Sequence, residues 1–541
     1  MISTANLFLI GLALVLLVTA LGALFWRRVY RDDAQNIARR VFKNSAVPFA
    51  MRLIVRALDM AFLIILIRTL PEAEVGAYFL ATMLVGQYLS TITEFGLGVL
   101  LTREVAQDPN AAPRLFGVTL LLRWLVVLLA AVPSAALLIA LYTLLGHTGL
   151  TETLDPASQA AIWILLLTLI PSAYSGAATA LYNAAERMEV PALLEVVTAV
   201  LSLVARLAVL WLGFGIVGLA WAAVGVTSTT ALIYLFLQTR SFFRPTLRWD
   251  RTLMRRLVPL ALPLMLNNLL SVMFFTSDLF IIKAFGAGQG DVLVAQYRVA
   301  YNILNIAMIL PPVVTFAVFP LLARHAAGER SVMRQAQNRT LQALLLLAFP
   351  LAMGMSLLAP DLIRLFSGEQ ASEYLPVSAR VLSLLAWFLP LSFVNGLLQY
   401  VLIAVNRQAA ITRAFIIGAT CNIVTNLIVI PVAVVVLMQP QVGLYAAAGT
   451  TILSEIVLLA IFLPLLRREE LMPPLPALAW RPAVAALLMG AAMGGVLFLV
   501  GAWGWLVAGV IAAPVYGAAL WLLGAFGAEE RALALRILGR V

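Results

Sequence analysis

Charged residues are scarce in this chain of 541 residues, and their scarcity excludes a soluble globular protein. Only 11% of the residues are charged, whereas 63% are hydrophobic, and the mean hydropathy is +1.01. A soluble domain carries roughly 25% charged residues. Apolar runs of about 18 or more residues recur along the whole sequence, and such runs are typical of membrane-spanning helices. The sequence therefore predicts an all-α, polytopic membrane protein.

Residues for disulfides, metal sites and catalysis are equally few. Cys421 is the single cysteine, so an intrachain disulfide cannot form. His147 and His325, the two histidines, lie in different connections, which argues against a structural metal site. The longest outward connections, near 146–157 and 361–375, are too short for the catalytic outer loop that a membrane glycan polymerase or ligase would need. We therefore expect no enzymatic reaction, no cofactor, no metal and no nucleic-acid partner.

About 14–15 transmembrane helices are expected, in two pseudo-symmetric six-helix lobes around a central cavity. Two C-terminal helices and one extra N-terminal helix, near 5–26, complete the prediction. The predicted organisation is an extra helix with a basic linker at 1–43, an N-lobe at 44–240, a basic inter-lobe loop at 241–257, a C-lobe at 258–466, and two C-terminal helices with a tail at 467–541.

The basic residues lie mostly on alternate connections, which predicts the orientation. One set of connections holds 27 of the 36 Lys and Arg residues, whereas the opposite set holds Arg68, Lys283 and Arg364. Because an excess of Lys and Arg marks cytoplasmic connections, we place the C-terminus in the cytoplasm. The first helix has Arg27 and Arg28 directly after its apolar run and no charge before it, which favours an uncleaved anchor over a signal peptide.

The sequence contains an internal repeat. The segment Asp59–Tyr78 has the same Asp-to-Tyr spacing as Asp278–Tyr297, and residues 181–210 align with 401–430. After these segments, VGLAWAA matches VGLYAAA. Each copy holds six predicted helices, an even number, so both copies would enter the membrane from the same side as parallel repeats. Two such bundles would leave a central crevice for a substrate.

One helix face inside the membrane carries three charges. A charge at this depth costs about 2.5–3.5 kcal/mol on insertion scales, so it is expected to face water or a partner. Arg52, Arg56 and Asp59 are spaced i, i+4 and i+7 and share one face. One Asp cannot neutralise two Arg, and the planar guanidinium suits phosphate groups. We therefore predict that Arg52 and Arg56 bind an anionic substrate, with Asp59 as their charge partner.

Further intramembrane charges extend this prediction. Arg298 and Asp278 lie at similar depth on adjacent helices, so we predict that Arg298 binds substrate beside the Asp278 carboxylate. Arg123 and Arg206 are further substrate-binding candidates. Arg123 could instead reach the cytoplasmic interface, and Arg206 could form a structural pair within one bundle.

The remaining acids and one arginine complete the inventory. Glu94 is predicted, with Asp59 and Asp278, to be a coupling or charge-partner residue. Glu195 and Glu455 also fall within spans and receive no role. Arg380 lies near a helix end and is expected to extend to the interface.

Several short motifs resemble the polysaccharide transport family of flippases, within the multidrug/oligosaccharidyl-lipid/polysaccharide exporter superfamily. The resemblance covers about residues 47–466. The motifs are EVGAY (74–78), EFGL (94–97), LTREVA (101–106), NIVTNLIVIP (422–431) and VGLYAAAGTTILSE (442–455).

This resemblance implies two six-helix lobes that open alternately to each side of the membrane. It also implies that the substrate is an undecaprenyl-pyrophosphate-linked oligosaccharide, moved from the cytoplasmic to the outer face for cell-surface polysaccharide assembly. Its pyrophosphate and sugar would lie in the cationic cavity while the lipid tail stays in the bilayer. The lipid-linked glycan and the bilayer are then the expected partners, and glycan polymerase and ligase proteins are candidate partners.

Two related functions remain alternatives. A cation-coupled multidrug exporter of the same superfamily would use a carboxylate such as Asp59 or Asp278 to bind a proton or sodium ion, but a net-positive cavity disfavours cationic drugs. A lipid II flippase would carry different motifs after the second helix, and these are not found. The driving force is left open between proton, sodium ion and membrane potential.

Overall fold

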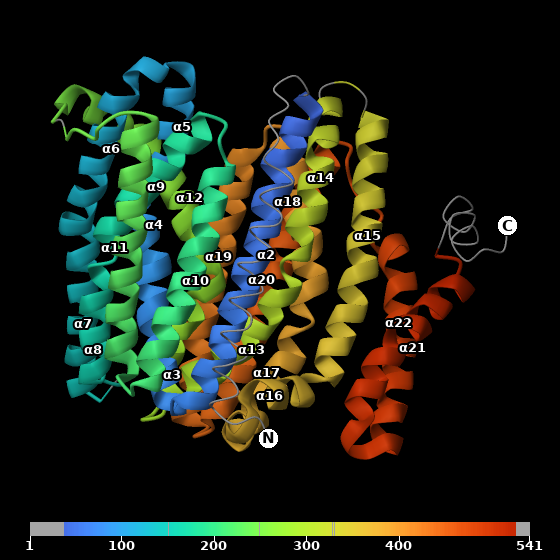
Figure 1. Ribbon diagram of the computed structural model, residues 1–541. Helices are drawn as coiled ribbons and strands as arrows, with labels where there is room; N and C mark the ends of the chain where they lie inside the picture. Colours follow the sequence, from blue (N-terminus) through green and yellow to red (C-terminus); the bar gives the residue numbers. More distant parts are fainter. Residues whose placement is uncertain (1–36, 150, 248, 327, 329, 526–541) are drawn as a thin grey trace. The chain divides into compact units, whose positions relative to one another are not determined.

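The structure, a computed structural model, describes residues 37–525 except residues 150, 248, 327 and 329. Within these residues every regular element is helical, which confirms the predicted all-α fold (Figure 1). The expected first helix near 5–26 and the tail arginines Arg531, Arg536 and Arg540 lie outside the described residues.

The described helices are long and apolar enough to make this a multi-pass membrane protein. Twelve of them qualify as membrane spans, and the bent pair Ala359–Leu385 and Phe388–Ala404, with an angle of 41° at its break, provides a thirteenth. The helix Ile37–Thr69 (α2) has 33 residues and is long enough to cross a membrane, but it carries four charges between Arg52 and Arg68. Counted with α2, the described chain agrees with the 14–15 helices expected for the whole sequence.

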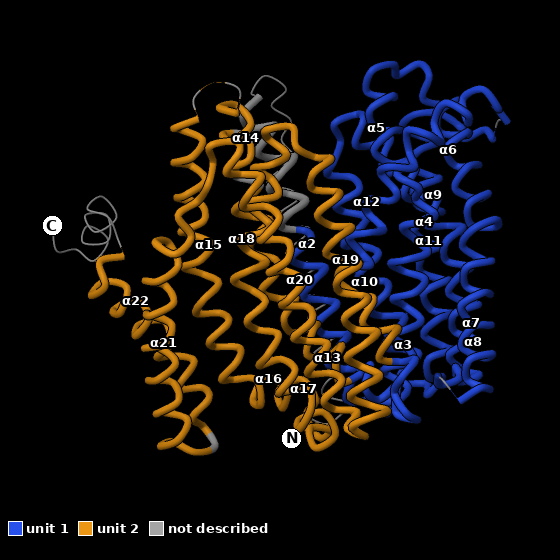
Figure 2. Tube along the Cα trace, turned by 180° about the vertical axis from the view of Figure 1, so that it is seen from behind, with its two compact units in different colours: residues 1–273, 283–295 blue, residues 274–282, 296–541 orange. Residues whose placement is uncertain are grey.

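The chain divides into two compact units (Figure 2). Unit 1 comprises residues 1–273 and 283–295, and unit 2 comprises residues 274–282 and 296–541. The helices up to the first part of α12 are α2 Ile37–Thr69, α3 Glu72–Met83, α4 Ser90–Glu94, α5 Leu97–Gln107, α6 Ala112–Val126, α7 Val132–His147, α8 Pro156–Leu166, α9 Leu169–Ala184, α10 Glu189–Trp211, α11 Gly215–Ser241 and α12 Arg251–Ala284. The later helices are α13 Gly290–Ala307, α14 Leu310–His325, α15 Arg330–Leu357, α16 Ala359–Ser367, α17 Ala371–Leu385, α18 Phe388–Ala404, α19 Gln408–Pro431, α20 Pro440–Arg468, α21 Leu475–Val500 and α22 Gly504–Leu522.

Unit 1 has a core of large apolar and aromatic side chains. Phe116 of α6, Tyr174 of α9 and Tyr234 of α11 belong to one buried cluster, and the Tyr174 hydroxyl donates a hydrogen bond to Gln238 at 2.7 Å. A second cluster packs Leu257 and other residues of the first half of α12 against α5 and α6. This contact explains why the first part of α12 belongs to unit 1.

The EFGL motif forms a break between α4 and α5. Phe95 and Gly96 both adopt the left-handed conformation, with φ of 52° and 67°. A Cβ atom on Gly96 would lie 2.6 Å from Leu264 Cβ and 2.9 Å from the Ala261 carbonyl oxygen of α12. Glycine is therefore required here both for the backbone conformation and for the close approach of α12.

Unit 2 places its two last helices beside α15. Met353 of α15, Met489 of α21 and Tyr516 of α22 lie in one buried cluster, and the Tyr516 hydroxyl donates to the Leu346 carbonyl at 3.0 Å. Elsewhere in the unit, α18 packs against α15, α14 and α20, and α19 packs against α20.

The two sequence repeats fold into the same local structures. Glu186 and Asn406, which the sequence alignment pairs, have φ of 56° and 60°. Each follows the end of a helix, and the next residue donates the same long-range hydrogen bond, from Arg187 N to Tyr182 O and from Arg407 N to Leu402 O, both at 2.9 Å. This is the 6→1 bond of a Schellman-type helix end.

The fourth helix of each repeat is also broken at the same place. The break between α8 and α9 is closed by a hydrogen bond from Thr168 N to Leu165 O, and the break between α17 and α18 by one from Trp387 N to Leu384 O. Pro171 and Pro390 follow three residues later in both copies. These matching breaks support the internal repeat predicted from the sequence.

Candidate functional site

The predicted cationic face of α2 is present and exposed. Arg52, Arg56 and Asp59 all have exposed side chains, whereas Met51 and Leu58 on the same helix are buried. The i, i+4, i+7 spacing places the three charges together because α2 is helical throughout. α2 packs against α10 within unit 1; the apolar Met51 and Leu58 are buried there, whereas the three charged side chains stay exposed.

Helix α10 adds two charges that the sequence did not place here. Glu195 forms a loose ion pair with Arg52, with 4.0 Å between Oε2 and Nε, and both side chains are about half exposed or more. Arg206 lies over the Phe62 ring at 4.7 Å and interacts electrostatically with Asp59. The resulting group has three arginines and two acids, so its net charge stays positive.

Arg123 and Glu94 occupy a different position in unit 1, where Arg123 is buried and Glu94 is partly buried. Arg123 is only 1% exposed, and its NH1 atom donates to the Ala173 carbonyl at 3.1 Å. Glu94 acts on it electrostatically. A Cβ atom on Gly176 would lie 2.5 Å from Arg123 NH1, so this glycine provides room for the guanidinium. The substrate-binding role of Arg123 stays a prediction, made now for a buried residue.

In unit 2, Asp278 lies among tyrosines. The carboxylate is buried, accepts a hydrogen bond from its neighbour Leu279 N at 3.0 Å, and interacts with the Tyr297 hydroxyl. Arg298 acts on it electrostatically and lies over the Tyr301 ring at 5.7 Å. The pairing of Asp278 with Arg298 and the binding role of Arg298 stay predictions, made now for two residues that interact electrostatically.

A second buried carboxylate in unit 2 had no assigned role. Glu455 of α20 is 2% exposed, and the Asn395 amide of α18 donates to its Oε2 at 2.5 Å and to its main-chain carbonyl at 2.8 Å. In the sequence, the sign that Glu455 could have a function was its position in the middle of an apolar segment, directly after VGLYAAAGTTILS. The partner on α18 could be found only from the fold.

A buried ion cluster joins two loops in unit 1. Lys283 is 2% exposed as a residue, and its Nζ lies 3.2 Å from Glu152 Oε2 and 2.8 Å from Asp291 Oδ2. The Glu152 carboxylate also accepts a hydrogen bond from Gly290 N at 2.9 Å. These contacts fix the turn between α12 and α13 to the segment before α8.

The opposite end of unit 1 carries exposed ion pairs. Arg256 pairs with Glu104 at 2.9 Å, and Arg114 pairs with Asp250. Asp250 caps α12 by accepting from Leu253 N at 3.0 Å. This backbone hydrogen bond, followed by the Arg114 contact, lowers the pKa of the Asp250 carboxyl. Glu469 plays a similar part in unit 2, where it pairs with Arg330 and Arg407.

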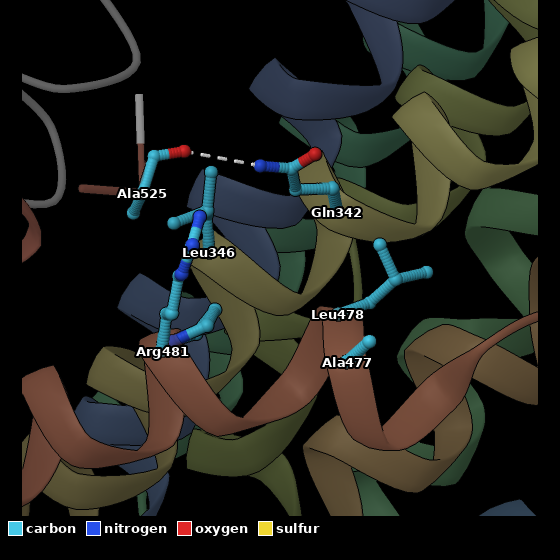
Figure 3. A pocket seen from close by; sticks show the side chains of 7 residues that line it. Gln342, Leu346, Ala477, Leu478, Arg481 and Ala525 are labelled. Carbon is cyan, nitrogen blue, oxygen red and sulfur yellow. Dashed lines mark hydrogen bonds between the residues drawn. The ribbon is translucent and has the colours of Figure 1, made fainter. Parts of the chain in front are cut away.

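A small cavity lies between α15 and α21 (Figure 3). Its volume is about 110 Å³, and Gln342 and Arg481 contribute its polar groups. Both are engaged with the chain after α22, since Gln342 donates to the Ala525 carbonyl at 3.2 Å and Arg481 to the Gly524 carbonyl at 2.8 Å. Ligand pockets usually measure roughly 300–1,000 Å³, so this cavity is too small for a lipid-linked sugar.

Within residues 37–525, no group of three or more His, Cys, Asp or Glu side chains is placed to hold a metal ion.

Comparison with protein families gives two matches. The profile described as polysaccharide biosynthesis protein matches residues 41–326, and the profile described as MatE matches residues 263–428. A protein from Haloferax volcanii named probable flippase AglR is 26% identical over 324 residues. The aligned part is 58% of this chain and spans 62% of the length of that relative.

Solved structures share the fold. The lipid II flippase MurJ in an inward closed conformation superposes with a TM-score of 0.68 at 13% identity, covering 88% of this chain and 99% of MurJ. An inward-facing multidrug resistance MATE family transporter of the MOP superfamily gives a TM-score of 0.63 at 17% identity, covering 78% and 98%. A MOP superfamily transporter from Pyrococcus furiosus gives 0.53 at 18% identity, covering 80% and 95%.

Proposed function

This chain belongs to the polysaccharide biosynthesis protein family, and from that premise we propose that it is a flippase for a lipid-linked oligosaccharide. The substrate would be an undecaprenyl-pyrophosphate-linked glycan, moved from the cytoplasmic to the outer face of the plasma membrane. The C-terminus would lie in the cytoplasm, and glycan polymerase and ligase proteins would act on the product.

The observation that carries this proposal is the exposed cationic face of α2. Arg52 and Arg56 present guanidinium groups that are not buried against unit 1. Arginine binds phosphate oxygens through two parallel N–H donors, which makes it well suited to a pyrophosphate. A lipid tail could remain in the bilayer while the charged group binds this face.

The acids beside the arginines allow the site to release an anionic substrate as well as to bind it. Glu195 and Asp59 each lie near one of the arginines and compete with an anionic substrate for them. A substrate phosphate therefore exchanges with an internal carboxylate, which keeps binding reversible. Reversible binding is what a flippase needs, since it must release its cargo on the other side.

The coupling or charge-partner residues are Asp59, whose side chain is exposed, and Asp278, which is buried. Glu94, which is partly buried near Arg123, would balance charge inside unit 1 as the two lobes change state. Arg206, beside Asp59, would extend the anion site of α2, and Arg298, beside Asp278, would bind an anion within unit 2.

The proposal is tested by removing the cationic face. The double variant R52A/R56A is expected to lower the flipping rate of a short-chain polyprenyl-pyrophosphate oligosaccharide in proteoliposomes by at least about tenfold, since losing a good charge-assisted contact costs about 1.5–3 kcal/mol. Flipping is measured by the access of an added glycosidase to the labelled glycan.

A matched control removes two exposed arginines from another helix. Arg334 and Arg339 are exposed on α15, and R334A/R339A is expected to flip at the wild-type rate. Undiminished flipping by R52A/R56A, at equal reconstitution, contradicts the anion-binding role of α2.

The second candidate is a cation-coupled multidrug exporter, favoured by the MatE match over residues 263–428. The two candidate functions differ in the substrate that is transported. An exporter protects cells against cationic dyes and is inhibited by them in proteoliposomes, whereas the proposed flippase is inhibited by free pyrophosphate-linked lipids. Competition by lipid II would instead favour a peptidoglycan precursor.

A further inference from the structure

Glu455 is the charged group that the anion site leaves unexplained. It is 2% exposed, and the hydrogen-bond partners described for its carboxylate, Asn395 and Ser392, are both uncharged. We propose that Glu455 and Asn395 form a proton-binding site inside unit 2, which couples proton movement to transport. The inference rests on the proposed flippase function, and it names a carboxyl that this function did not use.

The hydrogen bonding of Asn395 fits a site with two protonation states. Its Nδ2 donates to Glu455 Oε2 at 2.5 Å, which suits an ionised carboxylate. Its Oδ1 is buried and has no hydrogen-bond partner among the described atoms. A protonated Glu455 has one O–H to donate, and a rotated Asn395 amide can accept it through Oδ1. The same pair of side chains therefore satisfies either form.

Burial makes the exchange of a proton favourable at this position. An isolated carboxylate in an apolar interior is costly, and such a group tends to be neutralised instead. The hydrogen bonds from Asn395 and Ser392 offset part of that cost for the ionised form. Burial thus favours the protonated form and these hydrogen bonds favour the ionised form.

The internal repeat shows that the fold does not need this carboxyl. The alignment of VGLAWAA with VGLYAAA pairs Glu455 with Thr230, and the paired Pro171 and Pro390 align Asn395 with Gly176. In unit 1, Thr230 bonds Thr198 at 2.9 Å, and the space beside Gly176 is filled by Arg123. Unit 1 thus has a neutral hydroxyl at the position of Glu455, and the acid is a specific addition in the second repeat.

Other titratable groups around Glu455 do not neutralise it. Tyr301 of α13 interacts with it electrostatically. Arg380 of α17 lies over the Tyr445 ring, ten residues before Glu455 on α20 and therefore about 15 Å along the helix. The charged and titratable side chains on the helices packed against α20 are Glu373, Tyr374, Arg380, Tyr400, Arg413 and Cys421.

The position of Asn395 connects the site to a bend. Asn395 lies on α18, eight residues after Trp387, where the α17–α18 pair is bent by 41°. Protonation changes which amide atom of Asn395 faces α20. A change in the hydrogen bond between α18 and α20 can therefore shift the conformation of this broken helix. The proton lost from Glu455 passes to water on the side of the membrane to which the site opens.

The experiment measures protonation directly, without substrate. Infrared difference spectra of the purified full chain in lipid nanodiscs, recorded while the pH is stepped, are expected to show a protonated carboxyl C=O band that disappears in E455Q. The exposed Glu369 of the same unit provides the matched control, and E369Q is expected to retain the band. N395S, which keeps the carboxyl, is expected to move the band to higher frequency because the amide partner is lost.

Transport provides the second measurement. Wild-type flipping of the polyprenyl-pyrophosphate oligosaccharide is expected to be faster with an imposed pH gradient than without one. In E455Q the ratio of these two flipping rates is expected to fall to one. A band that persists in E455Q, or an unchanged ratio, overturns the proton site. Loss of the band in E455Q while the wild type moves no lipid-linked glycan supports the proton site and overturns the proposed substrate instead.

Discussion

At the scale of single residues, burial decides which charges are important for stability. Lys283 is almost fully buried between Glu152 and Asp291, whereas Arg364 pairs with Asp361 with 59% of its side chain exposed. Exposed pairs contribute about 0–1 kcal/mol, but removing one partner of a buried pair leaves an uncompensated charge. Removing Lys283 is therefore expected to cost far more stability than removing Arg364, although both residues lie near helix ends.

Replacing Lys283 tests this difference. K283M is expected to lower the free energy of unfolding by about 3 kcal/mol, because Glu152 and Asp291 are left facing each other without a cation. Thermal unfolding of the detergent-purified protein measures the change. R364M serves as the control and is expected to unfold within a degree or two of wild type; an equal loss in both variants contradicts the argument.

At the scale of elements, breaks in the helices are set by close packing as much as by local sequence. The α4–α5 break at Phe95–Gly96 lies against α12, and the α17–α18 break precedes Pro390. Three π-helical segments also interrupt the spans, at Leu84–Leu89, Val127–Ala131 and Val432–Val436. Such segments are frequent at functional sites. We therefore do not expect the membrane spans to be straight, rigid helices.

Gly96 provides the element-scale prediction. G96A combines a strained left-handed Ala with a Cβ 2.6 Å from Leu264 Cβ, and we expect a loss of about 2–4 kcal/mol. The loss is measured as a lower melting temperature. Gly225 lies in the middle of α11 with open space around it, so G225A is expected to be neutral or to stabilise by up to about 1 kcal/mol. A stable G96A protein argues against the packing described at this break.

At the scale of the whole molecule, orientation follows from the distribution of charge between connections. His147 lies in a connection assigned to the outside, and Gln408 in one assigned to the cytoplasm; both are exposed. The single native cysteine, Cys421, can be removed as C421S to leave no background thiol.

Labelling of intact cells tests this orientation. In the C421S background, H147C is expected to react with a membrane-impermeant maleimide, and Q408C only after the cells are permeabilised. The reverse pattern would invert the topology, and with it the proposed direction of transport.

The sequence alone determined the class of protein and its repeated architecture. Hydropathy defines the spans because the bilayer demands apolar helices about 20 residues long. The EFGL motif is recognisable in the sequence because Phe95 and Gly96 adopt a left-handed backbone conformation. The repeated Asp–Tyr spacing is recognisable as a pattern, but the contact between Asp278 and Tyr297 joins two helices. The charges on α2 were predictable for the same reason, since helical periodicity places Arg52, Arg56 and Asp59 on one face.

Only the tertiary structure decided which charges meet. Glu195 and Arg206 reach α2, Arg123 is buried beside Gly176, and Asn395 meets Glu455 because helices far apart in sequence pack together. No periodicity within one helix encodes those contacts. They depend on which faces of different helices are pressed together, and that is settled by side-chain packing across the whole unit.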